Sequence, residues 1–263
     1  RILASGSHLE QEVALRLIKH SPKSLSDIVA AYSRATPNLR EDLRQLVRDT
    51  KMMETYSRRL LEPNYPQGVL VDAWSCFPDE TVLRLFVELL AHNDEKMQMA
   101  AVRLLSAMQE PKSLPMLVLA LVQPDRYLPT RVAEVFVAMP QQSAALLTYM
   151  LPEVDDKHKE RVLEIIAHTG AEFAPQNVLA CLKHKNYRIR AAAALALGAG
   201  RIVEAVPALI LAVNDRKWQV RAAVAKPLGL IGDNAAIAIL TVLAEDSEGW
   251  VATNAREALE LFN

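Results

Sequence analysis

The residues best able to bind a metal or catalyse a reaction are few in this sequence, and they do not cluster. The six histidines are His8, His20, His92, His158, His168 and His184. No two are three or four residues apart, so no helix would present the paired imidazoles that often clamp a metal ion. The sequence also lacks Gly-x-Ser-x-Gly, Walker and Gly-x-Gly-x-x-Gly motifs. We therefore expect no metal, no cofactor and no catalytic centre.

Adjacent carboxylates are the second group that could do chemistry, in this case acid–base catalysis. Each pair precedes an expected helix, where a carboxylate can accept hydrogen bonds from unpaired backbone N–H groups and is favoured by the helix dipole. We interpret these residues as helix caps. The pairs are Asp79-Glu80, Asp94-Glu95, Asp155-Asp156 and Glu245-Asp246.

The densest local charge is a set of arginines. Arg40, Arg44 and Arg48 follow one another at a spacing of four, and Arg58 and Arg59 come next. The first three would share a helix face that could contact phosphates or an acidic partner. Acidic residues are interleaved, so an ordinary solvated face is the alternative. The whole chain has 30 Lys and Arg against 31 Asp and Glu, a net charge of −1, which disfavours nucleic acid as a partner.

These side chains must be positioned by an internal repeat of about 31 residues. The segments that begin at Ile189, Val220 and Val251 align at this spacing. The same interval continues backwards to Lys159, Leu128, Met97 and Pro66. Residues four and eight positions after each anchor are apolar, which predicts one buried face of a helix in every repeat. The first column contains Leu70, Ala101, Val132, Leu163, Ala193, Val224 and Ala255, and the second contains Trp74, Leu105, Phe136, Ala167, Leu197, Leu228 and Leu259.

A second apolar helix is expected after the first one in each repeat, and no alternating strand pattern competes with it. We expect Gly198, Gly200, Gly229 and Gly232 at the ends of first helices, whereas Pro227 falls inside one. The predicted second helices cover residues 82–90, 114–121, 144–151, 178–182, 206–213 and 235–243.

The predicted fold is therefore all-α, with about eight two-helix units in a single solenoid over residues 1–263. The repeats are divergent over 1–65, moderately regular over 66–186 and regular over 187–263. Each stacked repeat advances by about 10 Å, and Cys76 and Cys181 are more than three repeats apart. We expect both thiols to be free, as in a reducing compartment.

The pattern Val-Arg-x-x-Ala, then Ala-Leu-Gly and an Asp before the next repeat, resembles the HEAT family. It is most similar to the short bacterial HEAT-like repeats also found in phycobilin lyases. The resemblance implies a right-handed α-solenoid. One branch of the family, deoxyhypusine hydroxylase, holds two iron ions through His-Glu dipeptides. This sequence contains no such dipeptide, which disfavours that activity.

The resemblance also implies a polar ladder, in which an Arg at the start of each first helix meets an Asp in the turn between repeats. The matching residues are Arg190, Asp215, Arg221 and Asp246. Further upstream the arginine column contains Gln98, Pro129 and Glu160 instead. The ladder is thus complete only near the C-terminal end, and we expect specialised binding in the diverged N-terminal repeats.

Four aromatic residues fall one or two positions before a repeat anchor, in the expected turns between repeats. They are Tyr127, Tyr187, Trp218 and Trp250. One interpretation is that they pack each turn onto the previous repeat. The other is that they form a ridge of partner-binding residues, because Trp and Tyr are enriched in binding hot spots.

The favoured hypothesis is a non-enzymatic scaffold that binds a partner protein or peptide along its concave or edge surface. Second helices near 51–61, 79–91, 112–122 and 141–151 would line the concave side. One alternative is nucleic-acid binding through the basic N-terminal face, as in the HEAT-like alkylpurine DNA glycosylases. Another, implied by the phycobilin-lyase resemblance, is an accessory subunit of a lyase-type enzyme.

The expected location is the cytoplasm, because no apolar run is long enough to span a membrane. The sequence leaves open whether a signal or anchor segment precedes Arg1.

Overall fold

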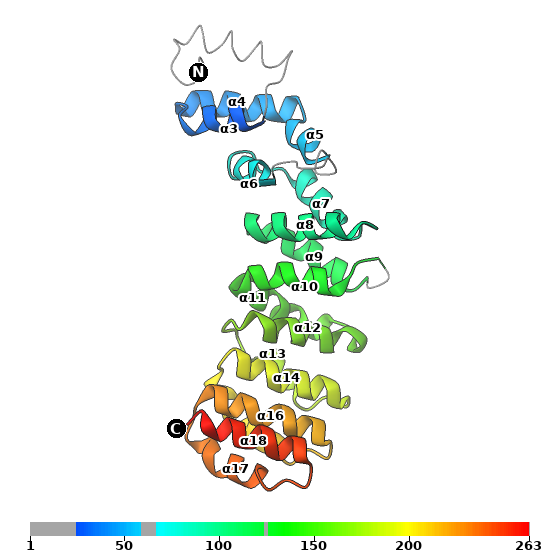
Figure 1. The fold of residues 1–263 in the computed structure, drawn as a ribbon, viewed down its shortest axis with the longest axis vertical. Helices are drawn as coiled ribbons and strands as arrows, with labels where there is room; N and C mark the ends of the chain where they lie inside the picture. Colours follow the sequence, from blue (N-terminus) through cyan, green and yellow to red (C-terminus); the bar gives the residue numbers. More distant parts are fainter. Residues whose placement is uncertain (1–24, 59–66, 124–125, 263) are drawn as a thin grey trace. The chain divides into compact units, whose positions relative to one another are not determined.

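The computed structural model describes residues 25–58, 67–123 and 126–262, and every regular element in these ranges is helical. Contacts divide the chain into two compact units, Arg1–Val135 and Phe136–Asn263, and each is described by itself. The prediction of an all-α repeat fold is confirmed (Figure 1). A single solenoid, its right-handed twist and a total of about eight repeats stay predictions.

The described residues of the first unit form a succession of short α-helices and a 3-10 turn. These are α3 (Leu25–Ser33), α4 (Pro37–Asp49), α5 (Met52–Arg58), α6 (Gln67–Cys76), α7 (Glu80–Leu89), α8 (Glu95–Met108), η2 (Pro111–Ser113), α9 (Leu114–Leu121) and α10 (Pro129–Ala138), the last of which reaches the boundary between units. Neighbouring repeats contact through α6 and α8 and through α7 and α9. Helices α5, α7 and α9 coincide with the predicted second helices.

The second unit continues the alternation with more regular helices. Its elements are α11 (Pro140–Met150), η3 (Leu151–Glu153), α12 (Asp156–Thr169), α13 (Gln176–Cys181), α14 (Tyr187–Ala199), η4 (Val203–Ala205), α15 (Val206–Ala212), α16 (Trp218–Ile231), α17 (Ala235–Leu243) and α18 (Gly249–Glu260). Helices α12, α14, α16 and α18 pack side by side as one layer (Figure 1). Helices α11, α13, α15 and α17 are packed against them and form what we call the second-helix layer.

The predicted core columns are confirmed. All seven residues four positions after an anchor, from Leu70 to Ala255, have an exposed fraction of 0%. The column eight positions after the anchors is buried too, except for Ala167 and Leu259, which are half-buried. This strict burial means that each first helix contributes one continuous apolar stripe to the core of its unit.

Gly198 and Gly229 lie in the last turns of α14 and α16, close to the helix ends as predicted, and they also make close helix contacts. A Cβ on Gly198 would lie only 2.4 Å from the Cα of Pro227, so α14 and α16 approach too closely for a side chain there. A Cβ on Gly229 would meet the Cβ of Ala258 at 2.9 Å, which is the same contact one repeat later. Gly200 and Gly232 do occupy C-caps, the latter with φ of 75°.

Both cysteines are free, as predicted, with Cys181 buried and Cys76 partly buried. Burial raises the pKa of each thiol, which works against formation of the nucleophilic thiolate. Among the described residues, no helix combines the length and the hydrophobicity that a bilayer crossing requires.

Candidate functional site: a turn ladder and an exposed second-helix layer

The turns of the second unit are held by two equivalent arginine–aspartate pairs, which we call the turn ladder. Arg190 donates from Nε and Nη2 to the two carboxylate oxygens of Asp215, at 2.7 and 2.8 Å. Arg221 makes the same two bonds to Asp246, at 2.7 and 2.9 Å. Paired hydrogen bonds between an arginine and a carboxylate are among the strongest hydrogen bonds in proteins. Each rung joins one repeat to the next.

Each rung also satisfies backbone groups that the turn would otherwise leave unpaired. Arg221 Nη1 donates to the carbonyl of Asp215 at 3.0 Å. Asp215 Oδ1 accepts the N–H of Lys217 at 2.8 Å, and Asp246 Oδ1 accepts the N–H of Glu248 at 2.9 Å. The ladder therefore fixes both the turn and the first residues of the following helix.

These bonds set the ionisation of the two carboxylates. Burial raises the pKa of Asp215, but the hydrogen bonds from Arg190 and from the Lys217 N–H outweigh it, and the pKa lies below its usual value. The bond from Arg221 is the main reason why the pKa of Asp246 is lowered, and burial opposes it. Both rungs stay ionised at neutral pH.

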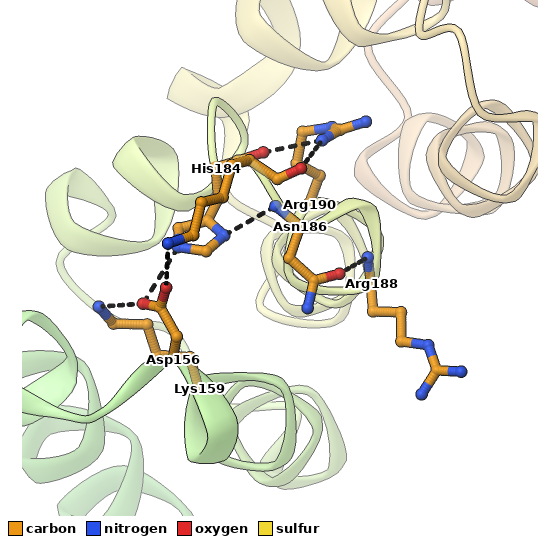
Figure 2. Close-up of polar contacts among 7 residues, drawn as sticks. Asp156, Lys159, His184, Asn186, Arg188 and Arg190 are labelled. Atoms are coloured by element: carbon orange, nitrogen blue, oxygen red, sulfur yellow. Dashed lines mark hydrogen bonds and ion pairs between the residues drawn. The ribbon is translucent and has the colours of Figure 1, made fainter.

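One repeat earlier, a histidine occupies the place of the ladder aspartate. His184 stands five residues before its anchor, like Asp215 and Asp246 before theirs, and its Nδ1 accepts the N–H of Asn186 at 3.1 Å. Because Nδ1 accepts, the ring proton sits on Nε2, which faces Asp156 Oδ1 at 3.2 Å (Figure 2). Arg190 still donates to the carbonyl of residue 184, at 2.8 Å.

Asp156 is thereby the acid of this rung, and it comes from the start of α12, the first helix of the preceding repeat. Lys185 Nζ lies 3.1 Å from its Oδ2, and Lys159 Nζ lies 3.4 Å from its Oδ1. The pKa of Asp156 is lowered, first by the hydrogen bond from Lys185 and then by the one from His184. The cluster in Figure 2 is thus a variant rung with the acid and base exchanged. In the described residues, no three His, Cys, Asp or Glu side chains are placed to hold a metal ion.

The candidate aromatic residues divide into buried and exposed members. Tyr127 is only 5% exposed and donates from its hydroxyl to Glu88 at 3.1 Å, so it packs the turn and offers no surface to a partner. Tyr187 is half-buried with Lys217 Nζ 5.9 Å from its ring. Trp218 is 36% exposed and Trp250 is 70% exposed. The ridge interpretation is therefore wrong for Tyr127 and stays a prediction for Tyr187 and the two tryptophans.

The candidate arginines of the first unit are engaged locally. Arg44 Nη1 donates to Glu41 at 3.2 Å and its guanidinium lies 5.3 Å from the ring of Tyr32. Arg48 Nη1 donates to Gln45 at 3.3 Å. Arg58 is the last residue of α5, and Arg59 lies outside the described residues.

The second-helix layer has a feature that we did not anticipate, which is the absence of charge. Helices α11, α13, α15 and α17 contain no Asp, Glu, Lys or Arg, and neither does α9 in the first unit. First helices such as α12 and α14 do contain charged residues. The layer nevertheless exposes large apolar side chains, which is unusual for a surface in contact with water only.

These exposed side chains recur at one position of the repeat, which we call the apolar column. In the second unit it consists of Tyr149, Ala180, Leu211 and Val242, at spacings of 31 residues. All four are exposed, Tyr149 by 80%, Leu211 by 74% and Val242 by 67%. Leu119 of α9, in the first unit, lies 30 residues before Tyr149 and is 63% exposed.

Comparison with protein families gives a match for the C-terminal part of this chain. A family model described as HEAT repeats matches residues 175–260. This segment consists of HEAT repeats. It contains both rungs of the turn ladder and both glycine contacts.

Among solved structures, an engineered protein is 16% identical over 96% of this chain and 78% of its own, with a TM-score of 0.42. Human deoxyhypusine hydroxylase in complex with glycerol is 17% identical over 97% and 99%, with a TM-score of 0.39. A designed armadillo repeat protein is 14% identical over 91% and 100%, with a TM-score of 0.37. A comparison with curated proteins found no match.

The HEAT repeat fold is typical of protein-interaction scaffolds and is generally non-enzymatic. Sequence reasoning missed two elements of these repeats. One is the place of His184 in the ladder, which its distance from the anchor could have revealed. The other is the absence of charge in the second-helix layer, which was visible in the sequence as apolar segments but was not used to locate the binding surface.

Proposed function

We propose that this chain is a non-enzymatic scaffold that binds a partner protein through its second-helix layer. The observation that carries the proposal is the apolar column, with Tyr149, Leu211 and Val242 each exposed by two thirds or more of their area. Removing apolar surface from water contributes about 25 cal/mol per Å², so such side chains favour a contact that covers them. Our earlier expectation was that the N-terminal repeats would carry the binding surface, whereas this column favours the second unit.

Rigid repeats suit this function because little ordering is needed on binding. The turn ladder and the glycine contacts lock neighbouring repeats together, so the column is presented on a prepared surface. The basic-face alternative has less support, because Arg44 and Arg48 already contact Glu41 and Gln45.

The test is affinity capture from source-cell lysate, with and without nuclease, followed by mass spectrometry. The bait is either the natural chain or the double variant Leu211→Glu/Val242→Glu. The matched control is Leu195→Glu, because Leu195 is also an exposed apolar residue (41%) but lies on the first helix α14. All baits are first compared by circular dichroism and thermal unfolding.

We expect a stoichiometric protein that survives nuclease and the control substitution but is lost with the double variant. Capture that is equally strong with the double variant would refute the proposal. Loss of all captured protein after nuclease, together with a steep salt dependence, would instead favour the nucleic-acid alternative.

A further inference from the structure

The second-helix layer ends in a groove between α15 and α17 with an apolar floor and acidic edges. The groove is open to solvent and has a volume of about 550 Å³. Val203, Pro207 and Leu211 form part of its lining and are exposed. Glu204 and Asp233 stand at its edge. Leu211 of the apolar column is thus one wall of the groove.

Charge in this region is strongly one-sided. Residues 202–215 and 232–248, which include α15, α17 and their turns, contain six acidic residues and no Lys or Arg. Asp215 and Asp246 are neutralised by the turn ladder. The other four are Glu204, Asp233, Glu245 and Glu248, and none of them has an ion-pair partner among the described residues. Two arginines of the neighbouring first helices reach these turns. Arg221 binds Asp215 and Asp246, and Arg256 donates to the carbonyl of Ala244 at 2.7 Å.

A second acidic hollow lies at the other end of the same two repeats. Its lining includes Val242 of the apolar column, Glu245, and the rung residues Arg221 and Asp246, which neutralise each other. The two exposed column residues, Leu211 and Val242, therefore each have uncompensated carboxylates near them. An apolar surface with edges of one charge selects partners of the opposite charge, because like charges at an interface are repelled.

We infer that this surface binds a basic amphipathic helix of the partner, with its apolar side towards Leu211 and Val242 and its Lys or Arg residues towards the acidic edges. This inference rests on the proposed function and specifies its partner. Packed helices are about 8–10 Å apart, and seven residues of an α-helix rise by about 10.5 Å. A helix laid across α15 and α17 would thus place apolar residues seven positions apart against Leu211 and Val242.

The surface does not suit the other classes of macromolecule. The carboxylates without an ion-pair partner would repel the phosphates of nucleic acid and of an anionic membrane. A second copy of this chain is a less suitable occupant, because its own corresponding surface is acidic as well.

The first experiment is selection of a phage-displayed library of random 16-residue peptides on the natural chain, after depletion on the Leu211→Glu/Val242→Glu variant. We expect the enriched peptides to have a net positive charge and apolar residues at helical spacing. Enrichment of neutral or acidic peptides would overturn the inference.

The second experiment measures the best enriched peptide, labelled with fluorescein, by anisotropy. The triple variant Glu204→Gln/Asp233→Asn/Glu245→Gln removes charge at constant size, and Asn at 233 can still accept the N–H of Ala235. We expect at least fivefold weaker binding to this variant and a further loss with rising salt. The Leu195→Glu control should bind as the natural chain does. Equal affinity for the triple variant, or self-association seen by light scattering, would contradict the inference.

Failure of this inference can be distinguished from failure of the proposed function. If lysate capture depends on Leu211 and Val242 but the selected peptides are not basic, the scaffold proposal stands and the partner chemistry is wrong. If neither the lysate nor the library gives a ligand that depends on the apolar column, both proposals fail.

Discussion

The turns of residues 175–260 and the turn that precedes α8 in the first unit make equivalent hydrogen bonds to backbone groups, but with different residues. In both, the residue one position after the anchor donates to a backbone carbonyl six residues earlier. Arg221 does so to Asp215, and Gln98 does so to His92 at 2.7 Å. In both, a side chain five residues before the anchor accepts a backbone N–H. Asp246 accepts that of Glu248, and His92 Nδ1 accepts that of Asp94 at 3.0 Å.

The difference lies in what connects one repeat to the next. The C-terminal repeats use paired bonds between partly buried charges, with 11–17% of each side chain exposed. Gln98 makes no such connection, and its Oε1 is buried without a partner. Connections of the first unit run through pairs such as Arg131–Glu95, in which the carboxylate is 77% exposed. The comparison teaches that the turn itself tolerates substitution, whereas a partly buried, two-bond connection between repeats depends on the Arg–Asp pair.

The largest expected effect concerns the close helix contact of the C-terminal repeats. Gly198→Ala would place a methyl group 2.4 Å from the Cα of Pro227, so two helix backbones must separate. We expect a loss of about 3 kcal/mol in the free energy of unfolding, measured by urea denaturation. Gly68→Ala in α6 of the first unit is the control, since nothing lies within 4 Å of the added methyl. Equal stability of the two variants would show that α14 and α16 can adjust freely.

The second prediction breaks one rung. Asp215→Ala leaves Arg190 partly buried without its carboxylate and removes the acceptor for the Lys217 N–H. We expect a loss of about 2 kcal/mol in the free energy of unfolding, measured by urea denaturation. The matched variant in the first unit is Glu95→Ala, which should cost less than about 1 kcal/mol because its carboxylate is exposed. A similar cost for both would remove the distinction between the two regions.

The third prediction concerns acid. Because the folded-state pKa values of Asp215 and Asp246 are lowered, the unfolded chain takes up protons first as pH falls. The stability that the rungs contribute is present above the ordinary Asp pKa of 3.8 and is lost as pH falls below it towards the folded-state values. At pH 6 the free energy of unfolding of the natural chain should be about 2 kcal/mol higher than that of the double variant Asp215→Asn/Asp246→Asn. This difference in stability should disappear towards pH 2. A difference that does not change with pH would show that ionisation of the rungs is irrelevant.

The smallest expected effect is a gain. The ladder spacing of 25 residues relates Gln98 to Gln123, so Gln98→Arg with Gln123→Asp would introduce a rung into the first unit. Gln98→Arg alone should lower the free energy of unfolding, because it buries an unpaired guanidinium. In a double-mutant cycle, the second change should contribute about 1 kcal/mol of favourable coupling. Additive effects would indicate that the turn of the first unit differs in backbone geometry as well as in side chains.

The sequence by itself determined the helices and their buried faces. Residues four positions after each anchor are apolar, and a period of 3.6 residues leaves such residues only one face to occupy, so their complete burial follows from the pattern. The caps at Asp79 and Asp94 are likewise local, because the accepting carboxylate and the donating N–H are two residues apart.

Only the tertiary structure decided which apolar residues stay exposed and which small residues lie where two helices approach closely. Leu211 and Leu209 lie on the same helix and are equally hydrophobic, yet one is 74% exposed and the other is fully buried. Gly198 and Pro227 come together from neighbouring repeats, and His184 meets Asp156 across 28 residues. Such pairings depend on how helices stack, and stacking follows from the shape of every neighbouring side chain rather than from a short stretch of sequence.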